Sequence, residues 1–461
     1  MKQRIIYKII VLLLLFIFSI IPFFVNKECI RGYLVFNYGI NIVFLVIYVY
    51  LESNRISVFL SPVFLTLLYL NINFFIGSWA YNEGYIYYPN WIKDYNSFKH
   101  LGVITFYFNL SNIFLLLSYE AARNRFFLLR INYNTLKVSN KSGLIIIFIN
   151  ALLLFLLSKI NLDLSIIGGT GDFSIAPKSI IAIILFLLIK KRFNKLRIFY
   201  YLIVLFFFVI ASYDNKRDAI FLVLPILLIE LLDKRIYYNI KTFFITLIPL
   251  SIIVYFILLM SIARGYGQYP VSGVIESTKY VDDYIKTDEF IIYFMNNIEV
   301  SSTTYNSMHA IEIILEQPNL MTYGETIIKF LFAPIPRKYF THKPRSMVDI
   351  YTMISDPEFR KEGNSYPIVI QSEAFWNFHF MGLVFLFFLY FISSIFYNTL
   401  LKQLKYRLLS GVNVVLLYGY TIFLYIPRGN GIGDFVIYFT IGFLFYVLLK
   451  LIFISVSVRF K

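Results

Sequence analysis

The chain has 461 residues, of which 59% are hydrophobic and 15% are charged, against about 25% charged residues in ordinary soluble domains. This composition excludes a water-soluble globular protein. The net charge of +16 comes from lysines and arginines clustered between apolar runs, a pattern typical of membrane topology signals and not of a nucleic-acid partner. The single cysteine, Cys29, excludes an intrachain disulfide and a cysteine metal cluster.

Unbroken apolar runs of about 20 residues recur along the chain, and a helix of that length spans the hydrocarbon core of a bilayer. The runs lack the alternation of apolar and polar residues that barrel strands would show. The sequence therefore predicts an all-α polytopic membrane protein with about 12 transmembrane helices. We expect these spans near residues 6–25, 33–51, 57–79, 101–119, 143–158, 174–190, 197–213, 214–233, 242–262, 376–397, 408–426 and 435–455.

The short loops between these spans carry an uneven distribution of positive charge. Those on one side hold 17 lysines and arginines and those on the other side hold 9. Because cytoplasmic loops are enriched in lysine and arginine, both termini are predicted to lie in the cytoplasm.

One connection, residues 263–375, is far longer than the others and contains seven of the 14 prolines. The orientation places it outside the cytoplasmic membrane, between transmembrane helices 1–9 (residues 1–262) and helices 10–12 (residues 376–461). Inside it, the pattern between Ser301 and Pro318 predicts an amphipathic helix, and "GETIIKFLF" predicts a second short helix that could lie in the membrane interface. Long loops in compact proteins usually have a function.

Cations gather at the outer ends of the predicted spans. Arg217 precedes the apolar half of span 8, Arg264 follows span 9, Arg337 and Lys343 lie in the proline-rich stretch "APIPRKYFTHKP", and Arg428 lies between spans 11 and 12. Each one alone is more often an interface anchor than a functional group. Together they stand on the side where topology predicts few cations, and guanidinium groups pair well with a diphosphate.

Two further side chains, Glu373 and His379, stand at the beginning of span 10 in "SEAFWNFHFMG". A carboxylate or an imidazole at this rim can act as a general base, although helix caps and arginine partners are commoner roles. The sequence contains no HExxH and no GxxxxGK[ST] motif, so we expect neither a metal ion nor a nucleotide cofactor.

These residues lie in stretches that resemble the O-antigen polymerase family, which assembles bacterial surface polysaccharides. The resemblance covers roughly residues 212–434 and rests on "YDNKRDAI", "ARGYG", "YGETIIKFLFAPIPRKYFTHKP", "GNSYP…SEAFWNF…G" and "PRGN". The family commonly has a proline-arginine-lysine-proline loop, which Pro336, Arg337, Phe340, Lys343 and Pro344 fill here. Its acid-plus-Asn-Phe motif is matched by Glu373, Asn377, Phe378 and Gly382, and its arginine before span 8 by Arg217.

Two positions depart from the family pattern. His379 stands where the family often has glycine, and Lys216 stands where a serine is frequent. Before residue 200 the chain resembles the family only in its hydropathy pattern.

The resemblance implies polymerisation of oligosaccharide repeat units carried on undecaprenyl diphosphate, at the outer face of the bacterial cytoplasmic (inner) membrane, without a cofactor. It implies that Arg217, Arg264, Arg337, Lys343 and Arg428 bind the substrate diphosphate, and that Arg337 also acts in catalysis. Glu373 is the first candidate for activation of the acceptor hydroxyl and His379 the second. The partners implied are the lipid-linked substrates, membrane lipids, a flippase and a chain-length regulator.

Two alternative functions stay open. An O-antigen ligase would use the same donor on the same side of the membrane, and fold alone cannot separate it from a polymerase. A flippase or exporter of lipid-linked oligosaccharides would also suit twelve spans, but it would be expected to have similar halves and short loops.

Overall fold

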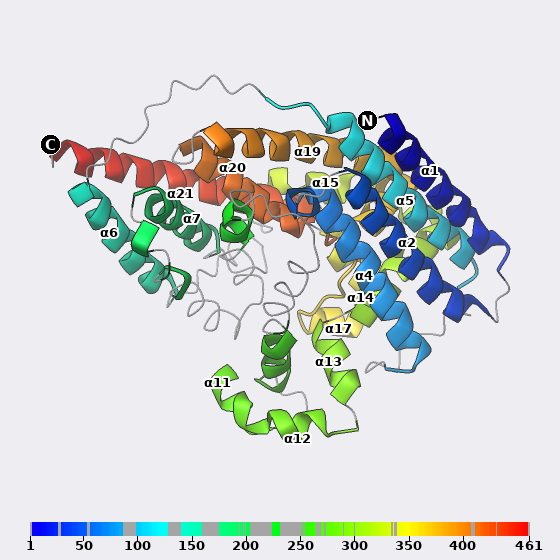
Figure 1. The fold of residues 1–461 in the computed structure, drawn as a ribbon. Coiled ribbons are helices and arrows are strands. Elements are labelled where there is room, and N and C mark those ends of the chain that lie inside the picture. The colour runs from blue at the N-terminus through cyan, green and yellow to red at the C-terminus, as the bar shows by residue number, and fades with distance from the viewer. Residues whose placement is uncertain are drawn as a thin grey trace.

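The computed structural model describes residues 2–25, 29–52, 56–85, 98–127, 140–158, 175–192, 194–196, 198, 200–202, 224–230, 251, 254–263, 269–271, 273–288, 290–298, 300–332, 335, 339–406, 411–429 and 431–459. Within these ranges the chain is almost entirely helical, and no β-strand occurs in them (Figure 1). The predicted all-α class is confirmed.

Among the described residues, six helices are long and apolar enough to cross a membrane, and each coincides with a predicted span. They are Arg4–Phe23, Gly32–Glu52, Pro62–Asn82, Leu101–Ala122, Ile370–Lys405 and Gly431–Leu451. Shorter apolar helices at Val254–Ala263 and Gly411–Tyr425 fall within two further predicted spans. The predicted spans at 197–213 and 214–233 lie mostly outside the described residues. The chain is therefore a membrane protein with several apolar helices.

Five helices form one half of the structure, and they pack through buried apolar and aromatic side chains. Helix α4 begins at Ser61, whose hydroxyl accepts a hydrogen bond from the Phe64 N–H, with Pro62 at the first helical position. Phe74 of this helix packs edge-to-face on Phe108 of α5, with ring centroids 4.7 Å apart. The helices are α1 (Lys2–Ile20), α2 (Ile30–Glu52), α4 (Pro62–Asn82), α5 (Leu101–Ala122) and α19 (Gly382–Tyr406).

A second group of helices forms its own core beside the first. Its members are α6 (Asn140–Ser158), α7 (Ile175–Arg192), α20 (Gly411–Ile422) and α21 (Gly431–Arg459). The Tyr418 hydroxyl of α20 donates to the Tyr438 carbonyl of α21 at 2.6 Å, which joins these two helices. Helices α6 and α7 lie at the predicted spans 143–158 and 174–190.

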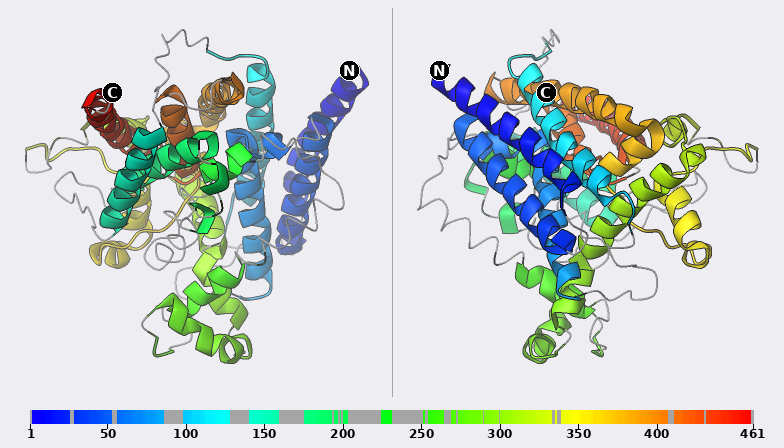
Figure 2. Two further views of the ribbon diagram at one scale, coloured as in Figure 1. Left: turned by 60° about the vertical axis from the view of Figure 1, so that its left-hand side comes forward. Right: turned by 90° about the vertical axis from the view of Figure 1, so that its right-hand side faces the viewer.

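The predicted helix between Ser301 and Pro318 is confirmed as α14 (Val300–Glu316), which ends before the 3-10 turn that begins at Pro318. It packs against α4, α5 and α18 (Ile370–Phe378), so this part of the 263–375 segment belongs to the bundle. By contrast, the shorter helices before it extend away from the bundle (Figure 2). These are α11 (Val274–Ser277), α12 (Val281–Ile285) and α13 (Phe290–Ile298).

Three short α-helices and a 3-10 helix, η8, follow the turn after α14. The stretch "GETIIKFLF" forms α15 (Glu325–Ile328) and the 3-10 helix η8 (Lys329–Phe332), as predicted. Helices α16 (Met347–Ser355) and α17 (Pro357–Lys361) come next, and serine and aspartate side chains cap their first turns.

The predicted span at 376–397 begins differently from the expectation. The chain there forms two helices, α18 and α19, joined by a 3-10 turn at His379–Met381. His379 has a φ of 52° and a ψ of −138°, a conformation that breaks a helix and that glycine adopts most easily. Because of this break, α18 is a helix separate from α19. It covers the end of the predicted long loop and the beginning of the predicted span at 376–397.

Candidate functional site

Helix α18 carries four polar side chains, those of Gln371, Ser372, Glu373 and Asn377, and is buried inside an apolar bundle. All its residues from Ile370 to Asn377 are buried. The Ser372 hydroxyl donates to the Ser307 carbonyl of α14 at 2.8 Å, and the Tyr107 hydroxyl of α5 donates to the Gln371 carbonyl at 3.1 Å. Because buried polar groups are costly unless they are hydrogen-bonded, this concentration of polar residues marks α18 as a candidate functional element.

A hydrogen-bonded network joins Glu373 to the segment around α15. The Thr326 hydroxyl donates to Glu373 Oε1 at 3.0 Å and accepts from Asn377 Nδ2 at 2.8 Å. Asn377 Oδ1 in turn accepts from the Thr322 hydroxyl and the Gly324 N–H, both at 2.8 Å. Glu373, with 1% of its surface exposed, is therefore fixed within a polar site assembled from residues 47 positions and more apart.

The turn that carries Arg428 lies against the chain that leads into α18. The Ile370 N–H donates to the Pro427 carbonyl at 2.9 Å, and the backbone of Arg428 forms an isolated bridge with Val369. The Val369 carbonyl also accepts the Glu373 N–H at 3.2 Å. Val369 thus links two of the predicted site residues, and Arg428 lies partly exposed beside the helix that bears Glu373.

Lys343 closes the proline-rich loop. Its ammonium group is buried, with the residue 8% exposed, and donates to the Ile335 carbonyl at 3.1 Å. These two residues bracket Arg337, which lies outside the described residues, as do Arg217 and Arg264. The observed contact of Lys343 holds the base of the loop that carries Arg337.

His379 lies at the junction of α18 and α19, where its ring contacts the Phe375 ring in a tilted arrangement, with centroids 4.5 Å apart. Gly382 starts α19 directly against α18, since a Cβ there would lie 2.5 Å from the Ala374 carbonyl oxygen. The positive φ of His379 gives a physical reason for the glycine that the resembling family often has at this position. In this structure His379 is thus part of the junction between α18 and α19.

Two buried side chains of α18 have no hydrogen-bond partner in the described part of the structure. Both amide atoms of Gln371 and the indole N–H of Trp376 are unpaired there. Sequence reasoning missed Gln371 and Thr326. The spacing of Gln371, Glu373 and Asn377 in one short polar stretch was the available signal for Gln371, whereas nothing near Thr326 pointed to its contact with Glu373.

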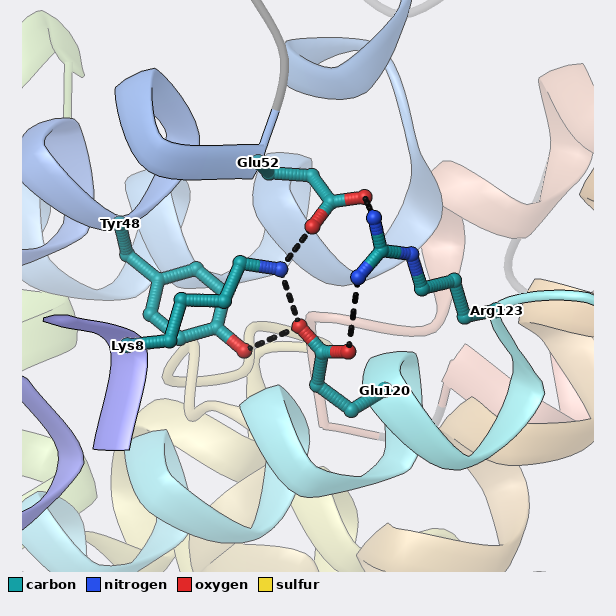
Figure 3. Close-up of polar contacts among 5 residues, drawn as sticks. All are labelled: Lys8, Tyr48, Glu52, Glu120 and Arg123. Carbon is teal, nitrogen blue, oxygen red and sulfur yellow. Dashed lines mark hydrogen bonds and ion pairs between the residues drawn. The ribbon is translucent and has the colours of Figure 1, made fainter. Parts of the chain in front are cut away.

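A second polar assembly, also missed by sequence reasoning, lies where α1, α2 and α5 meet (Figure 3). The Lys8 ammonium lies between the carboxylates of Glu52 and Glu120 and contacts Glu120 at 2.6 Å. Arg123 contacts the same two carboxylates at 3.2 and 3.6 Å, and the Tyr48 hydroxyl donates to Glu120 at 2.7 Å. Two cations and two carboxylates balance, so this Lys8 cluster is suited to joining helices and not to binding a charged ligand.

The two assemblies occupy different depths along α5. Tyr107, which contacts α18, lies six residues after Leu101, about 9 Å along the helix axis. Glu120 of the Lys8 cluster lies 13 residues further, about 20 Å away along the axis. The candidate site is therefore in the half of α5 that begins at Leu101, away from the Lys8 cluster.

No family model matches the chain, and searches of curated proteins and of solved structures find no relative.

Proposed function

We propose that this protein polymerises lipid-linked oligosaccharide repeat units into a bacterial surface polysaccharide, by glycosyl transfer at the outer face of the cytoplasmic membrane. The observation that carries the proposal is the buried Glu373, which is hydrogen-bonded to Thr326 and lies one turn from the Arg428 bridge. Three motifs of the resembling family, distant in the sequence, meet at α18: the α15 motif contacts the Glu373 carboxylate, and the Arg428 motif contacts the backbone at the start of the helix. A purely structural membrane protein gives no reason for such a meeting.

The proposal includes the orientation and the twelve spans predicted from the sequence. The Lys8 cluster lies near the start of α1 and the ends of α2 and α5, which are all cytoplasmic in that topology. Asn398 and Thr399 of α19 contact the end of α5, so α5 and α19 run in the same direction, as the predicted spans 4 and 10 do. With this orientation Glu373 lies in the outer half of the bundle.

In the proposed reaction, a sugar hydroxyl of one lipid-linked unit attacks the anomeric carbon of the glycan on a second carrier. A new carbon–oxygen bond forms, the bond from the anomeric carbon to the diphosphate breaks, and the lipid diphosphate leaves with the bonding pair. Glu373, held by the Thr326 hydroxyl, accepts the proton of the attacking hydroxyl. Fixed cations stabilise the charge that develops on the leaving group.

The backbone of Arg428 bridges to Val369, whose carbonyl accepts the Glu373 N–H. We assign Arg217, Arg264 and Arg337 to the same diphosphate on the basis of the sequence. Lys343 contributes through the loop it closes, since its ammonium fixes Ile335 two residues before Arg337. A flippase and a chain-length regulator are proposed partners, as the resemblance implies.

Replacement of Glu373 by glutamine tests the proposal, because it keeps the shape and the Thr326 contact but removes the proton acceptor. Expressed in a host whose own copy is deleted, Glu373→Gln is expected to leave the protein inserted but to yield surface glycan of a single repeat unit. Glu316→Gln is the matched control, since Glu316 lies on the surface and pairs with the exposed Lys99. Its polymer is expected to be normal.

The same electrophoresis and mass spectrometry separate the alternatives. Full-length polymer stranded on its lipid carrier in the deletion strain would indicate a ligase. Repeat units trapped on the cytoplasmic face would indicate a flippase. Normal polymer from Glu373→Gln would remove Glu373 from the mechanism.

A further inference from the structure

Helix α15 and η8 together form a thin layer that covers the candidate site. On the inner side, Thr326 is buried and donates to Glu373, and Ile327 packs on the core that contains Ile432 of α21. On the outer side, Ile328 and Leu331 are exposed, by 45% and 62%. The α15–η8 segment thus has the buried carboxylate on one side and exposed apolar side chains on the other.

This layer lies between the beginnings of two candidate membrane spans. At its start, Gly324 lies against Phe378 of α18, and the Phe378 ring packs on Phe385 of α19 at 5.3 Å. At its end, α15 and η8 contact α21. Both spans present apolar side chains to their surroundings further along, for example Phe388 on α19 and Leu444 on α21, each 57% exposed. The layer therefore packs against two candidate spans that themselves present exposed apolar side chains.

The residues at the ends of the layer are those found where a membrane meets water. Tyr323 and Tyr339 are 76% and 74% exposed and flank the segment, and tyrosine is enriched at both interfaces of a bilayer. Lys329 interrupts the apolar residues, and Arg337 and Lys338 follow in the sequence. An apolar face next to cations is the pattern of an element that lies in the plane of the interface.

We propose that α15 and η8 lie at the boundary between the lipid headgroups and the acyl chains, with Ile328, Leu331 and Ile335 in contact with the bilayer. The occupant of this apolar surface is membrane lipid. Where the proposed function holds, a lipid-linked donor approaches sideways through the membrane. It then meets α15, whose Thr326 contacts Glu373, at headgroup depth.

The depth of Leu331 can be measured with a single spin label. A chain with Cys29→Ser and Leu331→Cys carries a nitroxide at position 331, and the protein is reconstituted in vesicles of phosphatidylethanolamine and phosphatidylglycerol. Cys29 is the only native cysteine and is exposed, so it has to be removed. The relaxation of the label by oxygen, which concentrates in the acyl chains, is compared with its relaxation by a water-soluble nickel chelate.

Two matched positions calibrate the measurement. Leu444→Cys on α21 gives the value for an acyl-chain contact, and Glu362→Cys in the exposed turn after α17 gives the value for water. We expect the ratio of oxygen to nickel accessibility at position 331 to be several-fold higher than at 362 and to lie between the two calibration values. A ratio equal to that at 362 would overturn the interface placement.

This measurement is independent of polymer synthesis, so the two proposals can fail separately. Leu331→Ser tests their connection, because it makes the outer face less apolar without touching the Glu373 network. If the label reports lipid contact and Leu331→Ser reduces polymer length or amount, lateral access is supported. Lipid contact with unchanged polymer would keep the interface placement and remove the lateral route.

Discussion

His379 has a backbone conformation that is unfavourable for every residue except glycine. Its φ of 52° and ψ of −138° place it outside the regions that side chains with a Cβ readily adopt. Its ring contacts the Phe375 ring in a tilted arrangement, with centroids 4.5 Å apart. His379 therefore has two separable features, a strained backbone at the helix junction and an imidazole ring beside Phe375.

Substitution of His379 separates these two features. We expect His379→Gly to keep polymer synthesis and to stabilise the protein by about 1 kcal/mol, because glycine relieves the backbone strain. His379→Ala should destabilise it, since alanine keeps the strain and loses the ring contact. Thermal unfolding in detergent and analysis of surface glycan give the two readouts. Loss of polymer in His379→Gly, with the fold retained, would assign the imidazole to catalysis.

The sequence singled out Glu373, His379, Lys343 and Arg428 as site residues, and the structure describes all four. It could not predict that Thr326 meets Glu373, because the two residues are 47 positions apart and the chain between them forms η8, α16 and α17 before it returns. It could not predict the Lys343 contact either, since a buried ammonium bound to a backbone carbonyl has no signature in local composition. Chemistry-bearing residue types can be recognised in a sequence, but their partners depend on the tertiary fold.

At the scale of elements, α14 is the helix that joins the long 263–375 segment to the bundle. Its Glu312 side chain accepts hydrogen bonds from the backbone N–H groups of Lys99 and His100, at 2.8 and 3.2 Å. Those two groups lie at the start of α5, where N–H groups have no partner within the helix. Glu312 therefore caps α5 from another helix and fixes α14 at that end of the bundle.

Removal of this cap is expected to destabilise the protein. Glu312→Ala should lower the free energy of unfolding by about 1–2 kcal/mol, as the loss of a helix cap does, and should loosen α14. The matched control is Glu316→Ala one turn later, where the pair with Lys99 is exposed and is expected to be worth about 0–1 kcal/mol. Thermal unfolding of both variants in the same detergent gives the comparison. Equal effects would show that the contacts of Glu312 do not hold α14.

Element boundaries show what local patterns could and could not predict. The helix from Ser301 to Pro318 was predicted because a capping residue and a proline mark its ends, and α14 has nearly those bounds. The break between α18 and α19 was not predicted, because the apolar run continues across His379 and hydropathy alone does not report φ. The close approach of Gly382 to α18 that the break requires is a property of the assembled bundle.

At the scale of the whole molecule, the Lys8 cluster and the Glu373 network are two separate polar assemblies in the bundle. The first joins α1, α2 and α5 with balanced charges, and the second gathers polar groups around one carboxylate. The separation of about 20 Å along α5 means that changes at one should leave the local geometry of the other intact. Positive charge near the predicted cytoplasmic ends was read from the sequence as a topology signal, and the structure adds that Lys8 and Arg123 also hold helices together.

The charge balance of the Lys8 cluster predicts the effect of its single and double substitutions. Lys8→Met leaves two carboxylates with only the partly exposed Arg123, and an uncompensated buried charge costs about 3–5 kcal/mol. Adding Glu52→Gln removes the excess negative charge, so the double variant should recover most of that loss. Thermal unfolding of both in detergent measures the recovery, and Lys286→Met, which breaks an exposed pair with Asp282, serves as the control with little effect. A double variant no more stable than Lys8→Met would mean that Lys8 acts through packing on Tyr48, whose ring lies 5.2 Å from its ammonium, and not through charge.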